Sequence, residues 1–254
     1  MRREDVWING RSLRDVDARI ISVRVIEPET NEETSYAQNP GRSGQRLLSR
    51  YRASKKIQVQ FAIRELHDYA KRTEILDAVN AWAQDGVLEV STRHEQMARV
   101  IVTKYASAGN IAQYTDTFTI EFEMAGVPYW QDATPTSKTL TGTSASGQIT
   151  VRGSAETVVE AVVSHTSGTL DTLTINVGGS MLAFTGLGVA ANTDLIISHD
   201  ERGLLTIKAG SASKMSKRTA ASDDDLFALP GAVDVSMTAG TSATVLLTAR
   251  GRYR

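Results

Sequence analysis

The stretch TFTIEFEM at residues 117–124 decides which kind of fold this chain forms. Its apolar side chains alternate with threonine and glutamate: Phe118, Ile120, Phe122 and Met124. Because successive strand side chains point to opposite faces of a sheet, this period of two predicts a β-strand with one buried face. Residues 57–63 show the same alternation, and residues 21–25 and 100–102 show it over shorter runs. The first half of the chain is therefore predicted to form a β-sheet.

One segment in this half has a helical period instead, between about residues 68 and 85. Its apolar residues fall on a single helical face: Ile75, Leu76, Val79, Trp82 and Ala83. Gly86 follows and is a typical helix stop. We therefore predict one helix inserted into a β-sheet domain, with Trp82 buried on its apolar face.

The composition of the chain changes sharply near residue 130. Twelve of the 15 aromatic residues lie in residues 1–130, whereas glycine, serine and threonine rise from 22 residues before that point to 46 after it. A short segment rich in small polar residues, with Pro135, follows Trp130 and is typical of a linker. We predict a first domain over residues 1–132, a linker over 133–140 and a second domain over 141–254.

The second domain shows short strand-like runs separated by glycine and serine. The runs cover residues 149–151, 158–163, 173–177, 195–198, 204–208, 233–237 and 244–249. About seven short strands at this spacing favour a β-sandwich. The chain as a whole is thus predicted to be mainly β.

Residues 27–56 fit neither period and carry acidic residues first and basic residues later. A segment of this length without a regular pattern is typical of a functional loop, an arm or a long hairpin. We identify the basic residues as candidate contacts between subunits, because an acidic start and a basic end suit head-to-tail pairing. These residues are Arg42, Arg46, Arg50 and Arg52. The alternative is a solvated charged loop.

The charge balance excludes several classes of protein. Lysine and arginine total 28 against 29 for aspartate and glutamate, so the chain lacks the basic excess of a nucleic-acid binder.

There is no cysteine, which excludes disulfides, thiolate nucleophiles and Cys-ligated zinc. No apolar run approaches the length of a membrane span or of a secretion signal. We expect a soluble protein made in the cytoplasm, with no membrane insertion.

Catalytic and metal-binding patterns are poorly represented. The four histidines are scattered, and no HExxH, G-x-S-x-G or phosphate-loop motif occurs. We interpret His199-Asp200-Glu201 as a turn between strands, and Asp223-Asp224-Asp225 as a solvated loop in preference to a calcium site. The second domain has no tryptophan on which a sugar could stack, and its one tyrosine is Tyr253. The expectation is a protein without enzymatic activity, cofactor or metal.

Several segments, taken in order, resemble the distal tail protein (Dit) family of long-tailed, non-contractile bacteriophages. The matching segments are Trp7-Ile8-Asn9-Gly10, the arginine-rich stretch leading into residues 55–61, the helix around residues 71–82, residues 118–130 and the basic end at 245–253. The resemblance implies an amino-terminal domain that forms a hexameric ring and a peripheral, galectin-like β-sandwich.

The resemblance also implies a function and partners. Such a ring is part of the virion, is assembled in the host cytoplasm, and joins the tail tube protein to hub or receptor-binding proteins. DNA passes through its channel without specific binding, which agrees with a near-neutral charge.

Two other classes of function remain open at this point. The first is a two-domain glycan-binding module that attaches a virion or an enzyme to a cell surface. The second is a β-rich hydrolase, because catalytic carboxylates need only spatial proximity and leave no sequence motif.

Overall fold

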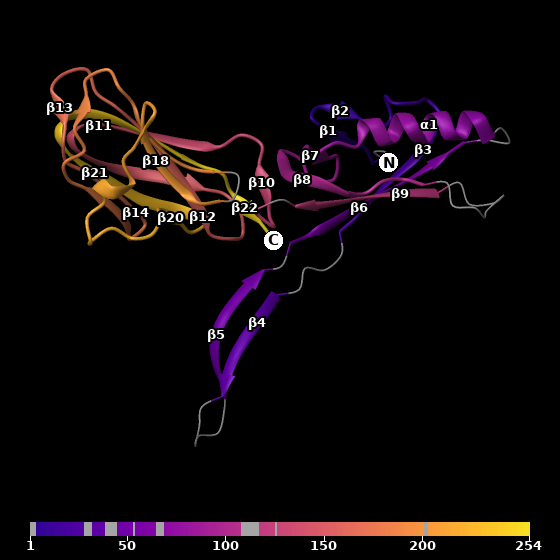
Figure 1. The fold of residues 1–254 in the computed structure, drawn as a ribbon, viewed down its shortest axis with the longest axis horizontal. Coiled ribbons are helices and arrows are strands. Elements are labelled where there is room, and N and C mark those ends of the chain that lie inside the picture. The colour runs from indigo at the N-terminus through magenta and orange to yellow at the C-terminus, as the bar shows by residue number, and fades with distance from the viewer. Residues whose placement is uncertain are drawn as a thin grey trace. The chain divides into compact units, whose positions relative to one another are not determined.

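The computed structural model describes residues 4–27, 32–38, 45–52, 54–64, 69–107, 117–124, 126–200 and 203–254. The chain forms two compact units, Met1–Tyr129 and Trp130–Arg254. Figure 1 shows that strands dominate both units and that the long helix belongs to the first. The predicted mainly-β fold is confirmed. No helix among the described residues is long and apolar enough to cross a membrane.

The first unit is an antiparallel sheet covered by one helix. Seven strands of this unit lie along the sheet in the order β2-β1-β7-β8-β9-β6-β3. The strands are β1 (Val6–Ile8), β2 (Arg11–Ser12), β3 (Ile20–Ile26), β6 (Lys56–Ile63), β7 (Gly86–Val90), β8 (Gln96–Lys104) and β9 (Thr117–Met124). The buried face predicted for residues 117–124 is confirmed, because Phe118, Ile120, Phe122 and Met124 are all buried.

The predicted helix is α1 (Tyr69–Trp82). Ile75, Leu76, Val79 and Trp82 are buried, so the apolar face identified in the sequence packs into the unit's core. The indole of Trp82 lies edge-on to Phe122, with ring centroids 6.4 Å apart. Its Nε1 donates a hydrogen bond to the carbonyl of Arg11 at 2.8 Å, which satisfies the polar edge of a buried ring.

A separate two-stranded ribbon occupies the segment that lacked a clear period. β4 (Glu32–Gln38) and β5 (Gln45–Arg52) pair antiparallel, as Figure 1 shows. Of the three possibilities left open by the sequence, the hairpin is the one that forms. We call residues 32–52 the hairpin arm.

The second unit is a β-sandwich built around two long strands, β11 (Thr136–Val151) and β21 (Gly231–Ala249). The first half of β21 pairs with β14 (Leu173–Val177) and the second half with β12 (Thr157–Ser164), while β11 follows β21 along nearly its whole length. Alternate residues of both halves, such as Val235 and Leu247, meet in one hydrophobic core. The two long strands therefore belong to both layers of the sandwich.

Most of the remaining strands extend these layers, whereas β13 pairs with β16 and β10 pairs with β22. The main sheet runs in the order β15-β14-β21-β12-β17-β18-β19, with β11 beside β21 and β20 beside β12. The additional elements are β10 (Trp130–Asp132), β13 (Thr169–Leu170), β15 (Ser180–Phe184), β16 (Val189–Ala190), β17 (Leu195–His199), β18 (Leu205–Ala209), β19 (Ala212–Ser213), the 3-10 turn Met215–Lys217, β20 (Phe227–Ala228) and β22 (Arg252–Tyr253).

Two expectations about this unit need correction. Residues 136–140, assigned to the linker, form the start of β11, and Leu140 is buried. The runs 233–237 and 244–249, expected as two strands, are parts of the single strand β21. Only small residues occupy positions 238–243 between them, namely threonine, alanine, glycine and serine, and the pairing with β11 shifts register here, since Gly142 stands opposite Ala243 and Ser144 opposite Thr238.

Candidate interaction site

Three ionic side chains hold the base of the hairpin arm. Glu27 follows β3, Lys55 precedes β6, and Arg93 lies in the turn between β7 and β8. Lys55 Nζ lies 2.5 Å from Glu27 Oε2, and Arg93 donates to both oxygens of the same carboxylate, at 2.7 and 2.8 Å. Lys55 is 7% exposed, so its charge is largely withdrawn from water and depends on Glu27. The two chain segments that lead into and out of the arm are thereby fixed to each other.

The structure locates three of the four candidate arginines on one strand. Arg46, Arg50 and Arg52 lie on β5, and Arg42 lies outside the described residues. In the register of the arm, Arg52 stands opposite Glu32, Arg50 opposite Thr34 and Arg46 opposite Ala37. The acidic start of the segment therefore pairs with its basic end inside one chain at the Glu32 and Arg52 positions. The role of the four arginines as contacts between subunits stays a prediction.

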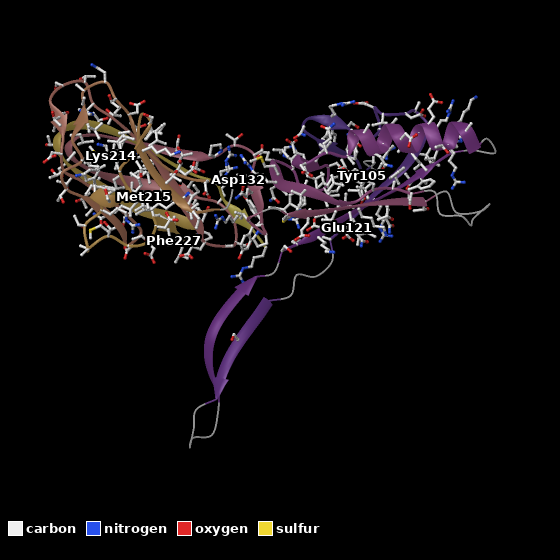
Figure 2. The ribbon with its side chains drawn as sticks, viewed as in Figure 1. Tyr105, Glu121, Asp132, Lys214, Met215 and Phe227 are labelled. Atoms are coloured by element: carbon white, nitrogen blue, oxygen red, sulfur yellow. The ribbon has the colours of Figure 1, made fainter. Side chains whose placement is uncertain are left out.

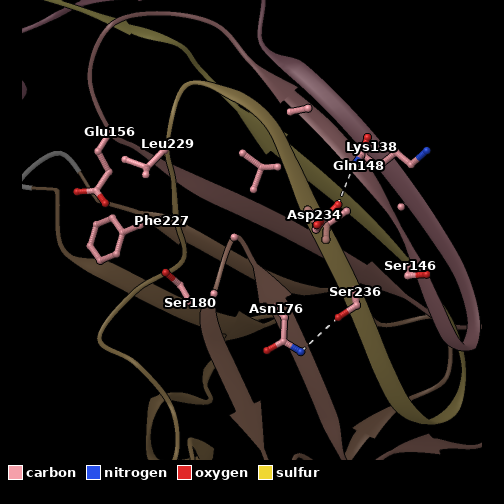
Figure 3. A pocket seen from close by; sticks show the side chains of 16 residues that line it. Lys138, Ser146, Gln148, Glu156, Asn176, Ser180, Phe227, Leu229, Asp234 and Ser236 are labelled. Atoms are coloured by element: carbon pink, nitrogen blue, oxygen red, sulfur yellow. Dashed lines mark hydrogen bonds between the residues drawn. The ribbon is translucent and has the colours of Figure 1, made fainter.

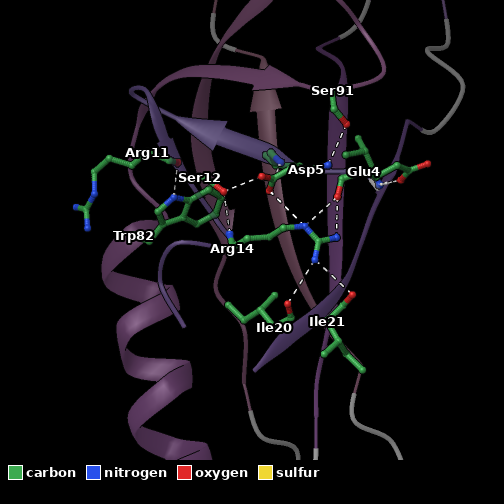
Figure 4. Close-up of polar contacts among 11 residues, drawn as sticks. Glu4, Asp5, Arg11, Ser12, Arg14, Ile20, Ile21, Trp82 and Ser91 are labelled. Carbon is green, nitrogen blue, oxygen red and sulfur yellow. Dashed lines mark hydrogen bonds and ion pairs between the residues drawn. The ribbon is translucent and has the colours of Figure 1, made fainter. Parts of the chain in front are cut away.

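A single arginine joins opposite ends of the first unit's sheet. Arg14 donates to the carbonyl of Glu4 from Nε and Nη2, at 3.2 and 2.8 Å. Its Nη1 reaches the carbonyls of Ile20 and Ile21 on β3, at 3.4 and 3.3 Å (Figure 4). Glu4 and Asp5 continue β1 near one end of the strand order, and β3 lies at the other end. The sheet therefore curls far enough for one side chain to span its two margins.

The outer face of this sheet carries a polar network centred on Glu121 of β9 (Figure 2). Lys56 lies 2.9 Å from its Oε1, and Gln58 and Thr103 also donate to its side chain. The hydrogen bond with Lys56 lowers the pKa of Glu121 and raises the pKa of Lys56. The network contains an acidic and a basic side chain, so it does not present the excess of positive charge that binds phosphate.

Two sequence clusters without an assigned function meet in the second unit. His199 Nε2 lies 2.6 Å from Asp225 Oδ2, and His199 Nδ1 lies 3.7 Å from Glu160. The hydrogen bond to Asp225, followed by that to Glu160, raises the pKa of His199 to about 9. Asp225 is 8% exposed, so the expectation of a wholly solvated Asp223–Asp225 loop is wrong at that residue. The partners are distant in sequence, and no local motif could have joined them.

The other members of these clusters have structural roles. Asp200 lies in a turn, since its Oδ1 accepts from the backbone of Leu204 and its carbonyl accepts from Gly203. The predicted turn is thus confirmed at Asp200 and is wrong at His199, which is the last residue of β17, while Glu201 lies outside the described residues. Asp223 Oδ2 accepts from the backbone of Met181 on β15 at 2.7 Å. Within the part of the chain that the structure describes, no three acidic or histidine side chains gather as a metal site.

A buried carboxylate ties the two ends of the second unit together. Asp132 on β10 accepts from the Tyr253 hydroxyl at 2.7 Å and from the backbone of Gly251 at 3.2 Å. Arg250 donates to the carbonyls of Asp132 and Ala133. A Cβ at Gly251 would lie 2.5 Å from the Asp132 carboxylate, so this close approach requires glycine. We call Asp132, Arg250, Gly251 and Tyr253 the terminal clasp.

The chain combines a helix-bearing β-sheet unit that has a long hairpin with a β-sandwich that follows it. This combination is shared with a solved phage protein. The chain matches over its whole length the crystal structure of the Dit protein (gp 19.1) of phage SPP1, described as a paradigm of the hub adsorption apparatus in phages that infect Gram-positive bacteria. The TM-score is 0.72 with 13% sequence identity, covering 98% of this chain and 99% of that chain. The fold expected from the resemblance is confirmed.

Other comparisons are weaker. A chain of the phage P2 baseplate in its activated conformation with Ca aligns over 98% of both chains with 8% identity and a TM-score of 0.45. The same baseplate with Sr gives 8% identity over 97% of both chains and a TM-score of 0.44. No protein-family model matches the chain, and no curated protein matches its sequence.

Proposed function

We propose that the chain is a structural subunit of a phage tail tip. Its amino-terminal unit forms a ring, hexameric as in the family it resembles, that joins the tail tube protein to hub or receptor-binding proteins. DNA passes through the channel of this ring without specific binding. The observation that carries the proposal is the full-length likeness to the SPP1 Dit fold, in which both units and their order along the chain agree.

The geometry of the first unit supports assembly through it. The hairpin arm is anchored at its base by the Glu27, Lys55 and Arg93 ion pairs, so a neighbouring subunit would meet an arm whose ends are already held. Among its described residues the same unit exposes three large apolar side chains: Ile21, Ile101 and Tyr105, of which Tyr105 is 53% exposed. Apolar and aromatic residues of this kind form the centres of protein interfaces.

The proposal is tested by the mass and shape of the assembled protein. Light scattering after size-exclusion chromatography is expected to give a closed oligomer whose fraction rises with protein concentration, and electron micrographs are expected to show rings with a central opening. A strictly monomeric protein, alone and after mixing with the tail tube protein of the same phage, would refute the ring.

A further inference from the structure

The second unit contains an open groove with a volume of about 1030 Å³. Its lining comes from β11, the β14–β15 turn, β20 and β21 (Figure 3). The proposed ring depends on the first unit, so this groove has no part in it. We define the groove by six residues: Lys138, Gln148, Asn176, Phe227, Leu229 and Asp234.

The floor of the groove is the polar face of adjoining strands. Gln148 stands opposite Asp234 in the β11–β21 register, and Asn176 stands opposite Ser236 in the β14–β21 register. Val233, Val235 and Met237 alternate with these β21 residues and are buried in the core. The period of two thus sends every second residue of β21 to the groove floor. These strands are held by the core, so the floor is preformed.

Hydrogen bonds within the floor orient its amide groups. Gln148 Nε2 donates to Asp234 Oδ1 at 2.8 Å, and Asn176 Nδ2 donates to Ser236 Oγ at 3.3 Å. Both amide oxygens and the second carboxylate oxygen of Asp234 accept no hydrogen bond from the described residues. The floor therefore presents fixed acceptors, with the serine hydroxyls beside them able to donate or accept.

One end of the groove is apolar. Phe227 is 37% exposed and Leu229 is 65% exposed, although both belong to a segment whose neighbours, Leu226 and Ala228, are buried. Backbone pairing of Phe227 with Val158 fixes the main chain from which the ring projects. Gly178 adopts a φ of +57°, and a Cβ there would lie 2.9 Å from Val233, so the turn that borders the groove needs glycine.

Charge and strand pairing exclude several ligands. The lining carries two carboxylates, Asp234 and Glu156, and one lysine, Lys138, so its net charge is negative. An anion such as a nucleic acid or a polyphosphate would therefore be repelled. At β15 an added β-strand is disfavoured, because the outer edge of this strand is already covered by hydrogen bonds with residues 219–223. What fits is a neutral, extended ligand with hydroxyls along its length and an apolar C–H face for the phenyl ring.

We propose that this groove binds a neutral saccharide chain. The amide oxygens and the Asp234 carboxylate accept hydrogen bonds from sugar hydroxyls, and Phe227 and Leu229 pack against the C–H face of one sugar ring. The absence of tryptophan from the second domain makes each site weak. Several copies on one assembled particle would multiply that weak binding through effective concentration.

The test uses the full-length protein and three neutral hexasaccharides, built from glucose, galactose and N-acetylglucosamine. Saturation-transfer NMR detects binding and calorimetry measures Kd, which we expect to be millimolar for at least one of the three. Asp234→Asn and Leu229→Ala are each expected to raise that Kd at least about tenfold, which corresponds to about 1.4 kcal/mol.

Matched variants outside the groove separate a local effect from a general one. Asp171→Asn and Leu204→Ala remove an exposed carboxylate and an exposed leucine elsewhere in the same unit, and they are expected to leave Kd unchanged. The proposal is overturned if none of the three sugars binds, or if all four variants weaken binding equally. Groove-dependent binding of an extended peptide or of poly(glycerol phosphate) instead of the sugars would also overturn it. If no saccharide binds, the proposal of a ring is not affected, because ring assembly is measured in a separate experiment.

Discussion

His199 shows how much one side chain contributes to the second unit. The imidazole is held between Asp225 and Glu160, and its pKa is raised from 6.5 to about 9. A proton bound more tightly in the folded state stabilises that state. The contribution is therefore fully present below pH 6.5 and is lost as the pH rises towards 9. Solvent screening at the half-exposed Glu160 reduces its size to about 1–2 kcal/mol.

We predict that the melting temperature of the second unit falls between pH 6.5 and 9, and that His199→Gln removes most of this fall. Thermal melts at several pH values measure it. His94→Gln is the control, because the side chain of His94 is 82% exposed. An unchanged pH profile in the His199 variant would contradict the ion pair.

Trp82 has the corresponding role in the first unit. Its ring is 2% exposed, contacts Phe122 and donates a hydrogen bond to Arg11. Trp82→Ala is expected to destabilise this unit by about 3–5 kcal/mol, because it leaves a cavity and an unpaired carbonyl. Chemical denaturation of the isolated unit gives the value. Trp82→Phe, which loses the hydrogen bond but keeps most of the ring volume, is expected to cost less, about 1–2 kcal/mol.

At the scale of secondary-structure elements, the hairpin arm gives a prediction about the assembly of subunits. Single exposed ion pairs are worth less than about 1 kcal/mol, so one arginine substitution should barely change assembly. Changing Arg42, Arg46, Arg50 and Arg52 together to glutamate is expected to weaken the oligomer and to leave the melting temperature of the monomer nearly unchanged. Assembly of the unmodified protein is expected to weaken as salt rises. Light scattering at several salt concentrations measures both effects.

The register of the arm supplies a control for that experiment. Because Glu32 stands opposite Arg52, Arg52→Glu places like charges across the hairpin and weakens the arm itself. The double variant Glu32→Arg with Arg52→Glu restores the opposite-charge pair within one chain. If the quadruple variant assembles fully and is indifferent to salt, the arm is not a contact between subunits.

How far the sequence predicts each element depends on apolar alternation. Strand β14 was predicted at its observed bounds, Leu173–Val177, because its apolar residues alternate and glycines follow it. The first twelve residues of β11 gave no such signal, since serine, threonine and glycine dominate them and their place in the sheet depends on pairing with β21. The sequence predicts a turn for His199 and a solvated loop for Asp225, because only the folded sheet brings the two side chains together.

The whole molecule divides at a single point, between Tyr129 and Trp130. The terminal clasp lies entirely in the second unit, because Asp132 on β10 is bound by residues 250–253. A fragment starting at residue 138 would lose β10 and the beginning of β11. The division observed in the structure therefore sets where the chain should be cut.

We predict that residues 1–129 alone form the oligomer and that residues 130–254 fold as a monomer. The aromatic-rich first unit has the hairpin arm and the exposed Tyr105, whereas the second has its own closed core. Light scattering on each fragment tests this, with a thermal melt to confirm that each one folds. Ring formation by the second fragment by itself would contradict the assignment.

The Arg14 contacts have a consequence for the behaviour of unassembled subunits. A strand with free backbone groups at its side is a template on which further chains can add one after another, and such growth has no natural end. Arg14 and Glu4 occupy backbone groups of Ile20, Ile21 and Val25 along β3, and residues 219–223 do the same for β15. Neither edge therefore offers free backbone groups at these positions to a further strand, so strand addition at β3 and β15 is hindered in unassembled subunits.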